Sequence, residues 1–82
     1  MRKRFIARAS CCGRLVRYYL LVNAASGGSR MYGILIEGGG SQEKIPAITP
    51  SRRRIQSLLE QLVQGCVTPV TVRDVVEDWL LM

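Results

Sequence analysis

Residues 14–22 have the sequence RLVRYYLLV, which is rich in β-branched and aromatic side chains. Side chains of these types fit the pleated surface of a β-sheet, and beyond Arg17 they are apolar on both faces of the segment. A strand that is apolar on both faces is buried most completely in the middle of a sheet. The segment therefore predicts the central strand of a small sheet.

Two further strands are predicted on either side of this segment. Residues 31–37, MYGILIE, are strongly apolar and follow a polar loop centred on Gly27 and Gly28, which predicts a hairpin with the central strand. Residues 3–9 alternate with a period of two, as a half-buried strand does. On this pattern one face of the strand carries Phe5, Ala7 and Ala9, and the other carries Arg4, Ile6 and Arg8.

The segment KIPAI at residues 44–48 follows a glycine turn and is extended in character. Its proline, Pro46, cannot donate to a neighbouring strand, so the segment is confined to a sheet edge or to irregular structure. The first half of the chain thus predicts a three-stranded antiparallel meander with a possible short fourth strand.

The hydrophobic period changes to that of a helix after residue 48. Thr49 is a suitable N-cap with Pro50 at the first helical position, and Gly65 is a stop signal, so the first helix is predicted over residues 50–64. Its apolar face is formed by Ile55, Leu58, Leu59, Leu62 and Val63. A second helix is predicted over residues 72–81, capped by Thr71 with Asp74 in a weak capping box. Its apolar face is formed by Val72, Val75, Val76, Trp79 and Leu80.

Two helices with one apolar stripe each are best buried on one face of an antiparallel sheet. The predicted fold is therefore α+β: three strands at residues 3–9, 14–22 and 31–37, then two α-helices packed on one face. With 82 residues, 48% of them hydrophobic and 22% charged, the composition is that of one small globular domain spanning residues 1–82. Its core is thin, and Trp79 is expected to pack in it.

Several segments together resemble a family of short uncharacterised proteins of Gram-positive anaerobic bacteria. The resemblance rests on YLLV at residues 19–22, YGILIE at 32–37, TPSR at 49–52 and VTPVTVRDVVEDWL at 67–80, and it spans roughly residues 18–80. It implies a bacterial, cytoplasmic protein that stands as a domain of its own. It carries over no functional residues.

The residue types present disfavour an enzyme. The chain has no histidine, and neither a nucleophile beside a base nor a cleft pair of carboxylates is visible, so no catalytic residue is predicted. Three cysteines without further ligands predict no metal site and indicate a reducing compartment. No cofactor, small-molecule substrate or membrane span is predicted, because the glycine stretches are turns and the apolar runs are short.

The charge is divided unequally along the chain. Residues 1–54 contain eleven of the twelve Lys and Arg residues and two acidic residues, hence +9, whereas residues 55–82 carry −3. Such a division can attract an anionic partner to one end of the domain or let two copies attract one another, although it also serves solubility alone.

Two basic clusters are candidate anion sites, and the first, Arg52 to Arg54, opens a predicted helix. Cations there oppose the helix dipole, and a bound phosphate would relieve this. The second cluster lies at the N-terminus, and the neighbouring strands carry tyrosines. Basic residues beside aromatic rings suit single-stranded nucleic acid, whose phosphates pair with the cations and whose bases stack on the rings. The clusters comprise Arg2, Lys3, Arg4 and Arg8 at the N-terminus, and Arg52, Arg53 and Arg54. The alternative is that the arginines are only solvated or pair with Glu43 or Glu60, and that the tyrosines pack in the core.

The sequence favours a small interaction or regulatory module that docks on an unknown protein partner or forms a homodimer. Docking would use a sheet edge or the apolar C-terminal end, which consists of Trp79, Leu80, Leu81 and Met82. The acidic last helix favours this over a nucleic-acid-binding module, because acidic groups repel phosphates whereas a dimer can use both ends of the chain.

Overall fold

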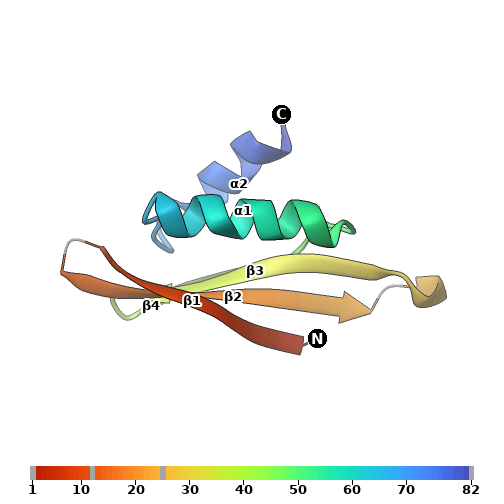
Figure 1. Cartoon of the computed structure of the whole chain (residues 1–82), viewed down its shortest axis with the longest axis horizontal. Coiled ribbons are helices and arrows are strands. Elements are labelled where there is room, and N and C mark those ends of the chain that lie inside the picture. The colour runs from red at the N-terminus through yellow and green to blue at the C-terminus, as the bar shows by residue number, and fades with distance from the viewer. Residues whose placement is uncertain (1, 12, 25, 82) are drawn as a thin grey trace.

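The computed structural model of the protein describes residues 2–11, 13–24 and 26–81. The strands form one antiparallel sheet in the order β1-β2-β3-β4, and the two helices lie on the same side of it (Figure 1). Helix α1 lies along the sheet, and α2 packs against α1 and β4. The elements are β1 (Arg2–Cys11), β2 (Arg14–Ala24), a short 3-10 turn η1 (Ser26–Gly28), β3 (Arg30–Gly38), β4 (Ser41–Thr49), α1 (Arg52–Gln64) and α2 (Val72–Leu80).

The predicted α+β order is confirmed, and the fourth strand is longer than the sequence indicated. β4 covers nine residues and pairs with β3 along the edge of the sheet. Its register with β3 shifts between Tyr32 and Ile34, opposite the segment that contains Pro46. A proline is tolerated in a sheet at such an irregular edge position, where its missing N–H leaves no ladder bond unmade.

The core lies between the sheet and the helices. Alternate residues of β2 and β3 point to the helix side, where Tyr18 and Ile34 are fully buried against Ile55 and Leu58 of α1. From α2, Val72, Val76 and Trp79 enter the same cluster. Trp79 therefore packs in the core, as the apolar spacing of the second helix predicted.

The other side of the sheet is covered by neither helix (Figure 1), yet Leu21 and Leu35 are buried there. Part of this burial comes from β4, which approaches β3 so closely at Gly33 that a Cβ would collide with the backbone of Ile45 and Pro46. The amide of Asn23 donates to the Pro46 carbonyl oxygen at 2.6 Å. The irregular segment of β4 around Pro46 therefore bends over the side of the sheet that has no helices.

Helix α1 begins two residues later than the sequence predicted. Its N-cap is Ser51, whose hydroxyl oxygen accepts from the Arg54 N–H at 3.2 Å. Thr49 ends β4 instead, and its hydroxyl accepts from the Ser51 N–H. The prediction of Thr49 as cap was wrong because two adequate capping residues flank Pro50, and strand pairing keeps the first in extended backbone.

The second helix begins as predicted at Val72, with Thr71 in the N-cap position, but the Thr71 hydroxyl makes no capping bond. It lies 3.4 Å from the hydroxyl of Thr68. The helix ends at Leu80, one residue earlier than predicted. The prediction was therefore right that Thr71 occupies the N-cap position, and wrong that its side chain makes a capping hydrogen bond.

A β-bulge interrupts β1 between Phe5 and Ala7 and changes which side chains share a face. The sequence predicted that Phe5 shares a face with Ala7 and Ala9. The extra residue reverses the alternation from that point, because two residues of a bulged strand oppose one of its partner. Phe5 consequently shares its face with Arg8, and Arg4 shares the helix side with Ala7 and Ala9.

Candidate anion-binding site

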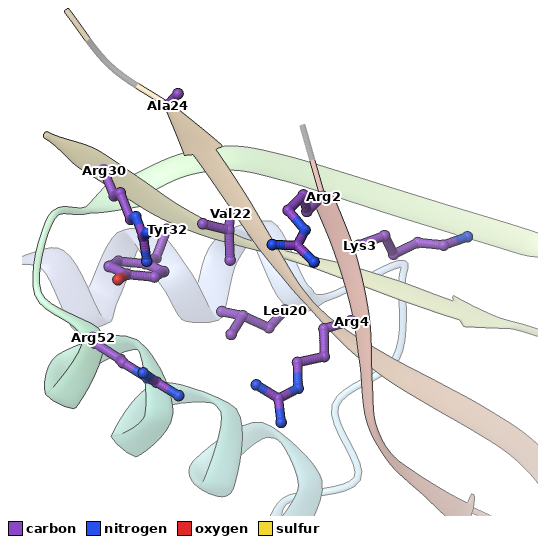
Figure 2. Close-up of a pocket in the computed structure, with 9 residues that line it drawn as sticks. All are labelled: Arg2, Lys3, Arg4, Leu20, Val22, Ala24, Arg30, Tyr32 and Arg52. Carbon is purple, nitrogen blue, oxygen red and sulfur yellow. The ribbon is translucent and has the colours of Figure 1, made fainter. Parts of the chain in front are cut away.

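A pocket of about 630 Å³ lies between the start of β1, the start of α1 and the hairpin that joins β2 to β3 (Figure 2). We call it the basic pocket. Its floor is apolar and formed by Leu20, Val22 and Tyr32, and its rim carries guanidinium groups. None of the described residues that line it is acidic. Its lining residues are Arg2, Lys3, Arg4, Leu20, Val22, Ala24, Arg30, Tyr32 and Arg52.

The alternation of β1 decides which N-terminal cations face the pocket. Arg2 pairs with Val22 and Arg4 pairs with Leu20, and residues opposite one another in a sheet share a face. Both arginine side chains extend toward the pocket, whereas Lys3 points away from it (Figure 2). The Lys3 ammonium lies over the Tyr19 ring at 4.9 Å from its centroid, on the side of the sheet without helices.

The three consecutive arginines of α1 are separated by the helix itself, because successive residues of a helix point about 100° apart. Arg52 extends into the basic pocket (Figure 2). Arg54 points instead to α2, where its guanidinium lies 4.7 Å from the centroid of the Trp79 ring. Arg53 is exposed and is not among the described residues that line the basic pocket.

Arg30 was not among the predicted site residues, although it lines the basic pocket together with them. It is the first residue of β3 and pairs with Ala24, the last residue of β2. In a meander the start of β1, the end of β2 and the start of β3 meet at one end of the sheet. The predicted strand order was therefore the signal that could have placed Arg30 beside Arg2.

Arg8 does not join the basic pocket. It pairs with Arg17 of β2 on the side of the sheet without helices, because the bulge at Phe5 and Ala7 turns it to that side. The N-terminal cluster is thus divided by the sheet: Arg2 and Arg4 lie on the helix side, and Lys3 and Arg8 lie on the other.

The alternative that the arginines of α1 pair with Glu43 or Glu60 is wrong. The Glu43 carboxylate lies 3.3 Å from the guanidinium of Arg73, which belongs to α2. Within the described residues this is the only ion pair. The arginines of the basic pocket therefore face one another without an acidic partner in the described chain, and an anion placed between them would reduce their mutual repulsion.

A smaller groove of about 460 Å³ lies farther along β1 and shares no lining residue with the basic pocket. It lies at the bulge, between Ile6 and Ala7 of β1 and Leu59 and Val63 of α1. Its described lining contains no cation and includes the acidic Glu60, so this groove is not part of the candidate anion site.

The predicted C-terminal docking residues differ in exposure. Trp79 is only 7% exposed and belongs to the core, so its ring offers little surface to a partner. Leu80 and Leu81 are 49% and 85% exposed. Met82 lies outside the described residues. The apolar surface at this end of the described chain is therefore formed by the two leucines.

Among the described residues, no three His, Cys, Asp or Glu side chains are grouped as metal ligands would be. No described helix has the length and the apolar character needed to cross a membrane. Cys11 is buried and Cys66 is exposed, and Cys12 lies outside the described residues.

A family model describes nearly the whole of this chain. It matches residues 3–82 and carries the description "Family of unknown function (DUF6514)". No curated protein and no solved structure matches the chain. The match extends over all four strands, both helices and every lining residue of the basic pocket except Arg2. The protein therefore belongs to the family of unknown function DUF6514.

Proposed function

We propose that the protein binds nucleic acid through its phosphate backbone and that the basic pocket is the contact site. The proposal rests on one observation: four arginines from β1, β3 and α1 converge on one cavity whose described lining contains no acid. Arg2 and Arg52 are fifty positions apart in the chain and meet only through the fold. Solvated charges need no such gathering, and like charges resist it.

The choice of arginine supports a phosphate ligand. Ten of the twelve basic residues in the chain are arginines, and all four cations that extend into the pocket are arginines. The guanidinium group presents forked donors that match phosphate oxygens in pairs, and it stacks on flat rings. The apolar floor beside Tyr32 can hold a sugar while the rim holds the phosphates. The function is then one of binding rather than catalysis, in the bacterial cytoplasm that the family resemblance implies.

The proposal is tested with two variants that remove the same charge from the same helical turn. Arg52→Ala removes a guanidinium from the basic pocket, whereas Arg53→Ala removes an exposed one outside it. We expect Arg52→Ala to weaken binding of a labelled oligonucleotide alike for all sequences and to reduce the salt slope by about one. We expect Arg53→Ala to bind nearly as the parent does. Fluorescence anisotropy over a range of salt concentrations measures both.

Two outcomes would count against the proposal. Equal losses in the two variants would mean that only the net charge matters and that the pocket has no special role. A parent protein that binds no oligonucleotide even at low salt, where phosphate contacts are strongest, would remove nucleic acid as the ligand.

A second candidate function is docking on a protein partner, and the partner is a second copy of this chain. The observation that favours it is the exposed pair Leu80 and Leu81 at the end of a helix whose acidic residues Asp74, Glu77 and Asp78 are also exposed. An acidic helix is complementary to the basic pocket of another copy. Sedimentation tests this candidate separately, as described below.

A further inference from the structure

Phe5 is an aromatic side chain on the surface of the sheet face that carries no helix. It is 52% exposed, although a phenylalanine usually lies inside a small domain. Its ring meets the ring of Tyr19 edge to face, with centroids 5.6 Å apart and planes at 75°. This arrangement is the one that aromatic pairs prefer, and it supports the Phe5 ring in a defined position while much of its surface stays open to solvent.

The bulge in β1 places Arg8, a further cation, on the face of the sheet that carries this ring. Without the bulge, Arg8 would be on the helix side, because Phe5 and Arg8 are an odd number of residues apart. With the bulge, Arg8 lies on the same face as Phe5 and opposite Arg17 of β2. Lys3 is on this face as well, two residues before Phe5. An open aromatic ring therefore shares this face with Lys3, Arg8 and Arg17, and Glu37 of β3, opposite Arg17, is the acidic residue near them.

Tyr19 supports Phe5 and is not itself the open ring. The Lys3 ammonium already lies over its face, at 4.9 Å from the centroid. The Glu37 side chain nearby raises the pKa of Tyr19, and the ring itself is held between Lys3 and Phe5. Phe5 is consequently the ring on which a flat ligand can stack.

This surface and the basic pocket lie on the two sides of one edge strand. Along β1, Arg2 and Arg4 are on the pocket side, and Lys3 and Phe5 alternate with them on the other side. β1 has a strand neighbour on one side only, so its outer edge is not covered by the sheet. A chain that crosses this edge can place phosphates on the arginines and a base on Phe5.

We infer that the nucleic acid bound by this protein is single-stranded and that one of its bases stacks on Phe5. The inference rests on the proposed function and adds the form of the ligand to it. Bases in a duplex are stacked on one another and offer no face to a protein ring, whereas unpaired bases do. An aromatic ring beside a positively charged track is the combination that binds single strands without regard to sequence.

The test compares two ligands that carry the same phosphates. One is an oligothymidylate, and the other is an abasic oligonucleotide of the same length. We expect the parent protein to bind the oligothymidylate more tightly, by about five- to 150-fold, which is the range for one stacked base. Phe5→Leu should lower its affinity for oligothymidylate to about that for the abasic strand and leave the abasic affinity unchanged. Phe5→Trp should preserve the preference.

A control variant separates stacking from a general loss of apolar surface. Leu15 is 44% exposed and pairs with Ser10 on the same side of the sheet as Phe5. Leu15→Ala should change neither affinity. A melting curve of each variant establishes that it is folded at the temperature of the binding measurement.

The possible failures are distinct. If the parent binds both ligands equally, or if Phe5→Leu weakens both to the same extent, the stacking inference is overturned and phosphate binding stands. If the parent binds neither ligand at low salt, the proposed function fails and the stacking inference fails with it.

Discussion

Three neighbouring arginines illustrate how little a residue's type alone says about its role here. Arg52 lines the basic pocket, Arg53 is solvated, and Arg54 lies over the ring of Trp79. A cation over an indole stabilises a protein by about 0.5–2 kcal/mol, depending on how far the pair is removed from water. The run of three that suggested one phosphate site thus supplies one site residue, one surface residue and one packing residue.

Tyr18 connects the sheet to the segment between the helices, and its hydroxyl donates to the Val67 carbonyl oxygen at 2.8 Å. Tyr18→Phe removes this bond and leaves the carbonyl without that partner, so we expect unfolding to become easier by about 1–2 kcal/mol near neutral pH. Urea unfolding measures the change. A variant as stable as the parent would mean that water replaces the hydroxyl without loss.

The same residue makes stability depend on pH in the alkaline range. Burial first, and the nearby Cys11 and Cys66 second, raise the pKa of Tyr18, so the folded protein keeps a proton that the unfolded chain releases above about pH 10. Unfolding is therefore favoured as the pH rises past that value, by up to about 1.4 kcal/mol per pH unit. Tyr18→Phe should lose this part of the dependence. Equal alkaline slopes in the two proteins would contradict the assignment.

Among the elements, α1 ends in an arrangement that usually contains glycine. The Val67 N–H donates to the Leu62 carbonyl at 3.0 Å and the Cys66 N–H to the Val63 carbonyl at 3.2 Å, which is the pattern of a Schellman motif. Gly65 is the C-cap at φ −85°, and the left-handed position falls on Cys66, at φ 50°. The predicted stop residue was right, but the residue after it bears the unfavourable conformation.

Cys66→Gly should therefore stabilise the protein. A side chain in the left-handed region costs about 1–2 kcal/mol, and glycine loses about 0.5–1 kcal/mol more than alanine through backbone entropy. The difference between these two effects predicts that the free energy of unfolding rises by about 0.5–1 kcal/mol in the glycine variant, as measured by urea unfolding under reducing conditions. Cys66→Ala is the matched control, since it removes the thiol and keeps the Cβ. A gain as large in the alanine variant would show that the thiol, and not the backbone, is responsible.

On the scale of the whole molecule, the charges are separated between a basic sheet end and an acidic last helix. Residues 1–54 carry +9 and residues 55–82 carry −3. Charges distributed in this way raise the rate at which an anionic ligand finds the basic end, and they favour contact between the opposite ends of two copies. The two candidate functions therefore draw on the same surface, and a nucleic acid would compete with a second copy for it.

Self-association follows if this contact is strong enough. We expect sedimentation at micromolar concentration and low salt to show a dimer that is lost when residues 80–82 are removed. Leu81→Ser should weaken the dimer. Val70→Ser is the matched control and should not weaken it, because Val70 is about as exposed as Leu81, at 83% against 85%, but lies outside the C-terminal apolar end. A strictly monomeric protein at high concentration would exclude the docking candidate and leave nucleic-acid binding untouched.

The order of the elements and most of the core could be predicted from local patterns in the chain. The apolar spacing from Ile55 to Leu62 and the apolar segment at residues 14–22 are local patterns, and burial of these side chains against one another requires two helices on an antiparallel sheet. The buried position of Trp79 follows from the same patterns, whereas for Tyr18 the sequence left both a surface role and core packing open. Arg2, Arg4 and Arg52 line the pocket together with Arg30. All three were predicted as anion-binding residues from their charge.

Which of these cations lie together depends on contacts between segments that are far apart in the chain. The bulge after Phe5 is set by pairing with β2, and it turns Arg8 away from the pocket and toward the Phe5 ring. The first turn of α1 begins after Ser51, and this start directs Arg52 rather than Arg53 into the pocket. Arg30 joins them because a meander brings the first strand beside the hairpin between the second and third. Charge is a property of one residue and can be read along the chain, whereas convergence depends on strand register and helix phase, which long-range packing sets.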